Sequence, residues 1–432
     1  MSQIFCPADI LLPDEGIDMS RWSVIACDQF TSQPEYWREL EKQVGDQPST
    51  LRLTLPEVFL DTDEEEKRLE GIRDAMETYL GEGFLVSYPD SLIYIERTDS
   101  TGKVRAGIIG ALDLEQYDYH KGSSSPIRAT EGTIEERIPP RLRVRRNAPL
   151  ELPHIMILID DPAGHVIEPL ADRTSLMKQV YDFDLMEGGG HLRGWLLDPQ
   201  SQKDLLAATA DLEKEADQQE SAGHICPLVY AVGDGNHSLA TAKACYEELK
   251  REHPGEDLSE HPARYALAEI VNLHSPALEF EAIHRIVTDV NTDELFAHMT
   301  KDLGLVKIRG TETAGNADPA AQCMTIVLKG QEERVLITRP SSGLTVGSLQ
   351  NFLDAYISSR AGIEDIKVDY IHGRENLKAL TWQNGSIGFL LPQMDKKDLF
   401  PTVIADGALP RKTFSMGHAE DKRYYTECRK IR

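Results

Sequence analysis

Hydrophobic and polar residues alternate along this chain with two periods, and these periods predict where helices and strands lie. Apolar residues recurring every three or four positions predict helices over residues 34–44, 61–80, 198–220, 238–252, 293–303, 346–357 and 397–405. Apolar runs and alternating stretches predict strands over residues 22–27, 91–98, 104–114, 154–159, 227–232, 264–273, 323–328, 334–339 and 387–391. Pro34 suits the first turn of its helix, and Thr62 is expected to cap the next helix. This mixture of elements predicts an α/β or α+β fold with a mixed sheet.

The chain length bears on the number of packed units. At 432 residues, the chain exceeds what one ordinary hydrophobic core organises. We expect a main catalytic α/β unit over residues 1–310 and a C-terminal α/β portion over residues 311–432 packed on it, or else one domain with large insertions. The small and polar residues 310–318 are expected to form a surface loop.

Composition and charge then narrow the class of protein. Hydrophobic residues make up 41% of the chain and charged residues 27%, which is typical of a folded globular protein. The 46 basic and 72 acidic residues give a net charge of −26, which repels nucleic-acid backbones and anionic membranes. We therefore expect neither as a partner, and any phosphate site must be a local basic island. The N-terminus predicts no signal peptide, and the scattered cysteines form no CxxC pair, so a cytoplasmic location is expected.

The sharpest local pattern is Gly233-Asp234-Gly235-Asn236-His237-Ser238, between a buried strand and an amphipathic helix. A strand-to-helix turn directs free backbone N–H groups and the positive end of the helix dipole at an anion. Asp234 suits a metal ion or a hydroxyl proton, and His237 suits a phosphate contact or acid–base chemistry. The alternative is a plain turn with a helix cap. No Gly-Lys-Ser/Thr follows, so this is not a Walker loop.

Six arginines gather between Tyr117 and Asn147, where hydrophobic periodicity is weak; they are Arg128, Arg137, Arg141, Arg143, Arg145 and Arg146. In an acidic chain, clustered guanidinium groups favour a phosphate or carboxylate ligand. The alternative is a solvated segment in which each arginine pairs with a surface acid. We expect one or two of the group to bind ligand, with Arg128, Thr130, Glu131 and Arg137 as candidates.

Three further motifs carry weaker signals. In Gly188–Trp195, His191 and Arg193 alternate onto one face of an expected strand, which a plain turn and strand explains equally well. The pair His284–Arg285 is a second candidate, although the histidines show no zinc-ligand spacing. The basic tail, which comprises Arg411–His418 and Lys422–Tyr425, either closes over an anionic ligand or docks on an acidic body.

The chain resembles a bacterial and archaeal family known as domain of unknown function 1015. The resemblance covers nearly the full length and rests on Trp22–Trp37, the stretch from Arg128, Gly233–His237, Leu278–Arg285 and Arg411–Gly417. The central loop also resembles the Asp-Gly-His-His-Arg loop of free-serine kinases with a ParB/sulfiredoxin-like fold. The resemblance implies such an element around residues 227–252, in which the loop holds nucleotide phosphates and the amino-acid substrate.

Carried over by position, Asp234 and His237 match the loop's Asp and second His. The sequence departs from the pattern at Asn236 and Ser238, where the kinases have His and Arg, so another arginine would have to contact the phosphate. Those kinases use an upstream carboxylate as base, for which Asp28 and Glu131 are candidates. The expected roles are catalytic for Asp234, His237 and Glu131, and substrate-binding for Asp28, His284 and Arg285. The expected phosphate- and nucleotide-binding residues are Gly233, Gly235, Asn236, Ser238, Arg128, Thr130, Arg137, His191 and Arg193.

These motifs lead to three hypotheses of different classes. The first is a phosphotransferase that phosphorylates a small hydroxyl compound, above all free L-serine, using ATP or ADP with Mg²⁺. The second is a ParB-like nucleotide-binding regulator that turns over no small molecule. The third is a metal-assisted phosphatase that would use His191, Asp234, His237 and His284.

Overall fold

The computed structural model of the chain describes residues 3–221, 228–308, 321–361, 365–417 and 422–432. The chain divides into two compact units, the first comprising residues 1–278 and 417–432 and the second residues 279–416. The second unit is therefore inserted in the sequence of the first. The expected division at residue 310 falls inside the second unit, whose sheet already begins at β15 (Phe280–Thr288). The expected loop 310–318 lies outside the described residues.

The main sheet of the first unit is mixed, as the sequence predicts. Among the described residues it contains ten strands, of which nine follow the order β11-β12-β5-β6-β14-β10-β13-β8-β7 and β1 pairs with β6. The β10–β14, β13–β8 and β7–β8 pairs are parallel and the other pairs are antiparallel. In the order given, the bounds are Lys178–Asp184, His191–Leu196, Ile93–Thr98, Val104–Asp113, Tyr265–Asn272, Met156–Ile159, Tyr230–Asp234, Ile127–Ala129 and Tyr117–Asp118, with β1 at Phe5–Cys6.

The C-terminal segment takes part in two smaller sheets of the same unit. One has the order β4-β2-β23-β9, with bounds Leu85–Ser91, Ala8–Pro13, Cys428–Lys430 and Leu150–Glu151. The other pairs β22 (Tyr424–Tyr425) with β3 (Val24–Ile25). The end of the chain is thus fixed against segments from its beginning, which is the docked arrangement among the two alternatives that the sequence left open.

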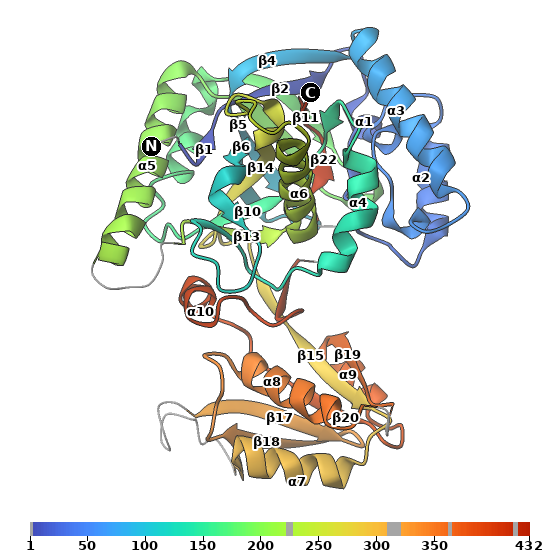
Figure 1. The fold of residues 1–432 in the computed structure, drawn as a ribbon, viewed down its shortest axis with the longest axis vertical. Coiled ribbons are helices and arrows are strands. Elements are labelled where there is room, and N and C mark those ends of the chain that lie inside the picture. Colours follow the sequence, from blue (N-terminus) through green and yellow to red (C-terminus); the bar gives the residue numbers. More distant parts are fainter. Residues whose placement is uncertain (1–2, 222–227, 309–320, 362–364, 418–421) are drawn as a thin grey trace. The chain divides into compact units, whose positions relative to one another are not determined.

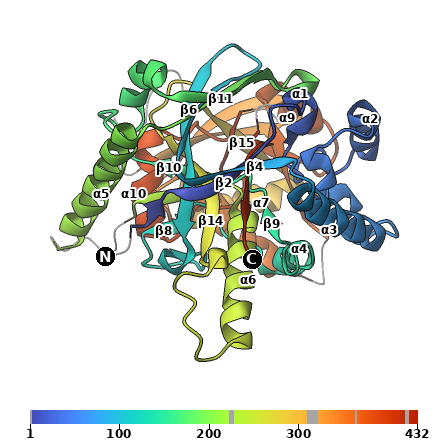
Figure 2. The same ribbon diagram turned by 90° about the horizontal axis from the view of Figure 1, so that it is seen from above.

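Helices cover both faces of the main sheet. They are α1 (Met19–Trp22), α2 (Pro34–Val44), α3 (Glu65–Gly81), α4 (Ile138–Arg145), α5 (Pro199–Ser221) and α6 (Asn236–Glu252). Short 3-10 turns are η1 (Thr50–Arg52), η2 (Glu57–Phe59), η3 (Leu114–Gln116), η4 (Glu135–Arg137), η5 (Glu168–Leu176), η6 (Met186–Gly188) and η7 (Pro262–Arg264). In Figures 1 and 2, α5 lies on one side of this unit and α2 with α3 on the other.

Side chains that alternate along the strands feed two hydrophobic cores, one on each face of the sheet. In β5, Ile93 and Ile95 pack with side chains of α2 and α3, whereas Tyr94 packs with side chains of α5 and α6. Burial on both faces explains why the central strands read as nearly continuous apolar runs.

The second unit is a smaller α/β body. Its sheet has the order β16-β18-β17-β20-β15-β19, with β21 also paired to β15. Apart from β15, the bounds in that order are Leu305–Lys307, Gln331–Ile337, Gln322–Leu328, Ile387–Leu390 and Lys367–His372, with β21 at Phe414–Met416. Its helices are α7 (Thr292–Leu303), α8 (Thr345–Ser358), α9 (Arg374–Leu380), η9 (Lys396–Asp398) and α10 (Leu399–Asp406). Leu295, Leu349 and Phe389 are fully buried in its core.

Most predicted elements are confirmed within a few residues, with two instructive differences. The arginine-rich stretch forms a helix, α4, where the sequence predicts none, because Pro139 and Pro140 fall in its first turn, where proline is compatible with a helix. Thr62 does not cap α3: the helix begins at Glu65, and the Thr62 hydroxyl donates to the Phe59 carbonyl instead (2.8 Å).

Candidate functional site

The predicted strand–loop–helix is present, and its turn is sterically demanding. Strand β13 ends at Asp234, and α6 begins at Asn236. Gly235 between them adopts φ +77°, and a Cβ on this residue would lie 2.9 Å from the Ile155 Cα. Only glycine satisfies both conditions, so the backbone of the turn is held closely against the neighbouring segment.

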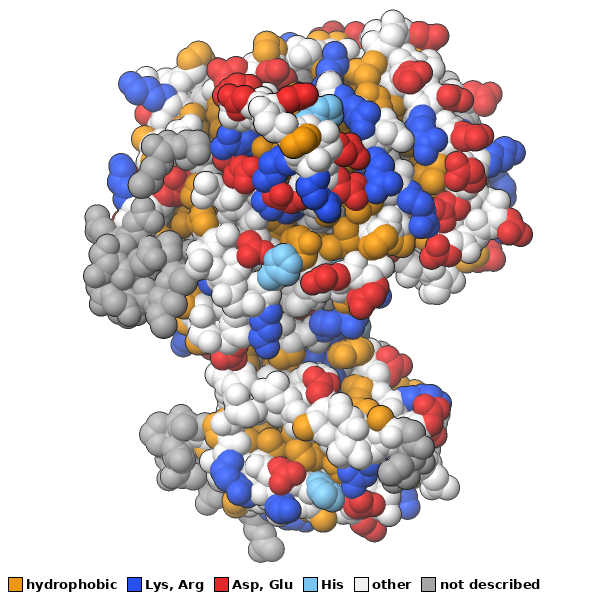
Figure 3. Space-filling view, in the orientation of Figure 1, with side chains coloured by type: hydrophobic (Ala, Val, Ile, Leu, Met, Phe, Trp, Pro, Cys, Tyr) orange, Lys and Arg blue, Asp and Glu red, His pale blue; other side chains and the backbone are white. Residues whose placement is uncertain are grey.

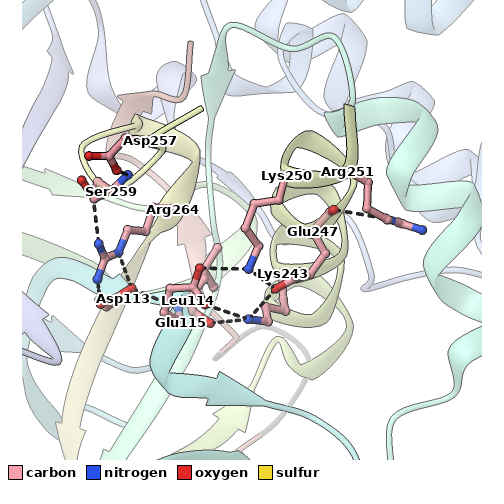
Figure 4. Close-up of polar contacts among 10 residues, drawn as sticks. All are labelled: Asp113, Leu114, Glu115, Lys243, Glu247, Lys250, Arg251, Asp257, Ser259 and Arg264. Carbon is pink, nitrogen blue, oxygen red and sulfur yellow. Dashed lines mark hydrogen bonds and ion pairs between the residues drawn. The ribbon is translucent and has the colours of Figure 1, made fainter. Parts of the chain in front are cut away.

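Helix α6 is anchored along its length, which fixes its N-terminal turn. Leu239, Ala242 and Tyr246 are buried against the sheet. On the polar side, the Lys243 ammonium donates to the Leu114 carbonyl and that of Lys250 to Glu115, both at 2.9 Å (Figure 4). Gly235 stands at the N-cap position of α6 and has no side chain with which to cap its first turn. Its N–H groups therefore face the site with the positive end of the helix dipole.

Asp234 is held on both oxygens. Its Oδ1 accepts from the Gly235 N–H (2.9 Å), and its Oδ2 pairs with the Lys422 ammonium (3.0 Å). Burial disfavours the charge of Lys422, but nearby carboxylates outweigh burial and raise its pKa. These carboxylates are Asp234, Asp28 and Glu131. Lys422 is therefore a cation next to the turn, contributed from the far end of the sequence.

The backbone of Lys422 is itself held in place by Arg97 of β5. The buried Arg97 guanidinium donates to the Lys422 carbonyl (2.6 Å) and to the Gly189 carbonyl (2.7 Å). The next residue, Arg423, forms buried ion pairs with Glu269 (3.0 Å) and Glu427 (2.7 Å). The backbone that carries Lys422 is thus fixed by buried charge-assisted contacts.

A second cluster lies beside the first and centres on His154, which is 5% exposed. His154 Nε2 lies 3.4 Å from Asp28 Oδ2 and 3.4 Å from Ser238 Oγ, and its Nδ1 lies 3.0 Å from the Tyr425 hydroxyl. Burial opposes the imidazolium charge, but the Asp28 carboxylate outweighs it and raises the pKa of His154. Burial likewise opposes the charge of Asp28, yet His154 lowers the pKa of that carboxyl overall. Each group therefore favours the charged form of the other.

Cys27 completes this cluster without being reactive. The Tyr425 hydroxyl donates to Cys27 Sγ (3.0 Å) and accepts from the Cys27 N–H (3.2 Å). Burial, reinforced by the neighbouring acids Asp28 and Glu57, raises the pKa of the thiol to about 12. Cys27 therefore stays a neutral thiol and serves to orient Tyr425.

The segment after β8 is tied to the turn. The Thr130 hydroxyl donates to the Val232 carbonyl (2.7 Å), and the Ile134 N–H donates to His237 Nε2 (3.4 Å). Glu131 lies close enough to Lys422 to raise its pKa. Arg128 is buried and donates to the Ser123 carbonyl (3.0 Å). Thr130, Glu131 and His237 therefore belong to the same site as Asp234.

Most of the remaining arginines are paired with acids, as the alternative interpretation proposes. Their ion pairs are Arg141–Glu57, Arg143–Glu65, Arg145–Glu151 and Arg146–Glu248. The face of the first unit in Figure 3 accordingly shows basic and acidic side chains interspersed. Arg137 is exposed, and its carbonyl caps the Arg141 guanidinium (2.7 Å).

The structure places the other predicted site residues elsewhere. His191 lies between Asp184 (2.7 Å) and Asp182 (2.8 Å), and Arg193 pairs with Glu96. Both side chains lie on the face of the sheet opposite to that of Arg97, because side chains alternate along a strand.

His284 and Arg285 belong to the second unit. Arg285 is fully buried and donates to the carbonyls of Ile283, Lys412 and Arg411 at 2.7–2.9 Å. His284 Nδ1 accepts from the Leu391 N–H (3.2 Å). Burial, together with neighbouring cations, lowers the pKa of His284 to about 4. These contacts give both residues structural roles within that unit.

The described residues contain no group of three or more His, Cys, Asp or Glu side chains arranged to hold a metal ion. A preformed site of the kind that the phosphatase hypothesis requires is thus absent from this part of the chain. Mg²⁺ differs, because proteins bind it through one or two carboxylates together with the phosphates of a ligand. Asp28 and Asp234 fit that pattern.

Sequence reasoning did not identify His154 as a residue of the site, and it left the role of Lys422 open. His154 stands alone before a short strand, with no motif around it. Lys422 lies in the tail, for which ligand closure and docking were left open. Lys422 contacts Asp234 across 188 residues of sequence, and His154 contacts Ser238 across 84 residues. These long-range contacts bring both residues to the site. No local pattern carries that information.

Comparisons with known proteins place this architecture in context. No curated protein matches. Among solved structures, a free serine kinase in complex with AMP aligns with 10% identity and a TM-score of 0.40 over 76% of this chain and 93% of that one. A free serine kinase in complex with ADP aligns with 11% identity and a TM-score of 0.39 over 76% and 93%. A conserved hypothetical protein from Pyrococcus furiosus aligns with 10% identity and a TM-score of 0.34 over 73% of this chain and 97% of that one.

Two findings complete the comparison. Across the described residues, every helix is too short or too polar to cross a membrane. The model of the family described as "Protein of unknown function (DUF1015)" matches residues 11–356, which is most of the sequence. The chain therefore belongs to the DUF1015 family.

Proposed function

We propose that the chain is a phosphotransferase that moves a phosphoryl group from ATP or ADP to the hydroxyl of a small molecule. The observation that carries the proposal is the convergence of Asp28, His154, Asp234 and Lys422 at the uncapped N-terminus of α6. Phosphoryl transfer needs a phosphate cradle, a nearby cation and a proton acceptor, with little further chemistry from the protein. L-Serine is the first acceptor to test, since the central loop resembles that of free-serine kinases.

The phosphate cradle is the first turn of α6. Its uncapped N–H groups and the helix dipole favour phosphate oxygens, and Gly235 lets the ligand approach the backbone. Lys422 supplies positive charge beside Asp234, and so replaces the arginine that the kinase loop has at the position of Ser238. Mg²⁺, when bound with the nucleotide, would neutralise phosphate charge.

Asp28 is the proposed proton acceptor. It is kept ionised by His154, and its carboxylate lies at the same imidazole nitrogen as the Ser238 hydroxyl. In the transfer step, the acceptor oxygen forms a bond to phosphorus, and the bond from phosphorus to the donor's bridging oxygen breaks. The hydroxyl proton passes to Asp28, and the nucleotide leaves with the bond electrons. Asp234, His237 and Glu131 position the phosphates and Lys422.

Phosphorus NMR of the purified chain tests this proposal. The sample contains Mg²⁺ and L-serine with either ATP or ADP, and the expected result is a serine-dependent phosphomonoester signal. Asp234→Asn and His237→Ala should retain the fold, by circular dichroism, and lose most of the turnover. Near wild-type turnover in either variant would exclude the turn as the active site. Nucleotide binding without any product from hydroxyl compounds would instead support the regulator.

A further inference from the structure

A small cavity of the first unit opens beside the site and is mainly apolar. Its volume is about 130 Å³. Its walls include Leu53, Leu55, Met76 and Leu150, each less than 5% exposed, together with Leu60 and Val144. For comparison, a dry cavity of about 150 Å³ lined by aliphatic and aromatic side chains binds benzene. The cavity is thus large enough for a compact hydrocarbon group.

The cavity shares part of its wall with the proposed active site. His154, Ser238 and Tyr425 line this part, and Asp28 Oδ2 lies 3.4 Å from His154 Nε2. A hydroxyl placed there lies near both His154 Nε2 and Ser238 Oγ. The cavity therefore combines polar groups of the acid–base cluster with a mainly apolar wall.

The other polar groups of the wall already have partners within the chain. Glu57 pairs with Arg141, and Arg145 pairs with Glu151 at 2.6 Å. The Thr241 hydroxyl donates to the His237 carbonyl (2.7 Å). A second polar ligand group would have to break these pairs, whereas an apolar group gains from leaving water and from contact with the walls.

We infer that the acceptor substrate is a hydroxyl compound with a compact apolar group of about four to six carbons, which fills this cavity. The hydroxyl lies at His154 and Ser238, beside the proton acceptor Asp28. This inference rests on the proposed function and narrows its acceptor. Serine has a single side-chain carbon and would leave the cavity unfilled.

Binding of plain alcohols tests the cavity without requiring turnover. The probes are ethanol, 1-propanol, 1-butanol, 1-pentanol, 1-hexanol and 1-octanol, titrated into the full chain and followed by ligand-observed NMR. The expected affinity rises about fourfold per methylene, until the cavity is filled, and then levels off. An affinity that does not change with chain length would overturn the inference.

Paired leucine variants locate the binding. Leu55→Ala enlarges the cavity and should move the preferred alcohol to longer chains by roughly two or three carbons, the size of the group removed. Leu170→Ala is the control, because Leu170 is as deeply buried as Leu55, with 3% and 4% of each residue exposed. Leu170 packs in the other core, away from the cavity. If Leu55→Ala does not fold, Ala148→Val narrows the same cavity and should favour shorter chains. Equal preferences in the cavity variant and the control would overturn the inference.

Phosphoryl transfer to the best-binding alcohol separates this inference from the proposed function. Transfer with a chain-length optimum that Leu55→Ala shifts supports both. Chain-length-dependent binding with no phosphorylated product supports the apolar site and overturns the phosphotransferase. Transfer to L-serine, together with alcohol binding that Leu55→Ala leaves unchanged, overturns the apolar acceptor and retains the phosphotransferase.

Discussion

Two charged regions of the first unit have similar sequence signals and very different structures. Helix α4 carries three arginines and is followed directly by Arg146, and each of the four pairs with an acid. The turn between β13 and α6 offers fewer charges in sequence, yet Asp234 there meets Lys422, with Asp28 and His154 alongside. In α4 the charges neutralise one another in pairs. At the turn they gather around an uncapped helix N-terminus and beside a cavity that His154 and Ser238 line.

The difference shows that charge density along the chain is a weak indicator of a site. An arginine run in an acidic protein finds acids nearby, and most such pairs contribute little. A stronger signal is a set of residues that are distant in sequence but converge on a buried charged group, where burial alone would favour the neutral form of that group. The two regions therefore predict opposite responses to substitution.

We expect the largest effect from Asp28→Asn, which should impair catalysis. Loss of the proton acceptor should lower kcat by about 10²- to 10⁴-fold, with the fold retained. Asp118→Asn is the matched control, because Asp118 also pairs with a histidine, His120 at 2.5 Å, away from the turn. Equal losses in the two variants, measured by coupled nucleotide assay, would remove Asp28 from the mechanism.

Substitution of the turn glycine should cost the most stability. Gly235→Ala combines φ +77° with a Cβ 2.9 Å from the Ile155 Cα, so we expect a loss of about 2–5 kcal/mol in urea unfolding. Gly255→Ala is the control, because Gly255 has φ +90° and no atom lies within 4 Å of the added Cβ. It therefore measures the cost of the backbone conformation alone, for which we expect about 1–2 kcal/mol. If Gly235→Ala costs no more than its control, the close approach to Ile155 is not a constraint.

Lys422→Met should weaken nucleotide binding while Lys422→Arg preserves most of it. The methionine removes the cation beside Asp234 and leaves that carboxylate without its ion-pair partner. We expect a roughly 10- to 100-fold increase in the Kd of ATP or ADP, corresponding to about 1.4–2.8 kcal/mol at tenfold per 1.4 kcal/mol. Calorimetric titration distinguishes this from a loss of turnover alone. An unchanged Kd for Lys422→Met would assign Lys422 to structure only.

The Asp28–His154 pair should make stability depend on pH. The pKa of His154 is raised from 6.5, so its stabilising contribution is complete below pH 6.5 and is lost as pH rises through the folded value. The pKa of Asp28 is lowered from 3.8, so its contribution is present above pH 3.8 and is lost as pH falls further. The stability difference between wild type and His154→Gln should therefore be largest between these limits and shrink above pH 6.5. A difference that grows with pH would contradict the ion pair.

Sequence reasoning predicted the elements well because their signals are local. Helix α2 begins and ends at Pro34 and Val44, as its periodicity indicates, and the strand–turn–helix around Gly235 was identified from a few residues. Of the residues in the proposed site, the sequence singled out Asp234, His237 and Asp28. His154 and Lys422 reach it by long-range packing, and His284 and Arg285 lie in a unit whose boundary no composition change marks.

The smallest expected effect comes from Arg143→Ala in the paired region. The Arg143 side chain is 44% exposed, and it contacts Glu65 (2.7 Å) and Asp61 (3.1 Å). Glu65 is buried, but the arginine is solvated, and pairs with a solvated partner are worth about 0–1 kcal/mol, so the free energy of unfolding should change by no more than that and turnover should not change. Arg141→Ala is the informative companion, because Arg141 is only 15% exposed, pairs with the half-buried Glu57 and lines the cavity. Its loss leaves Glu57, whose pKa burial already raises, without its cation, and should lower stability more than Arg143→Ala does. Equal losses of stability in the two variants would show that burial beside the cavity does not make Arg141 more important for stability than Arg143.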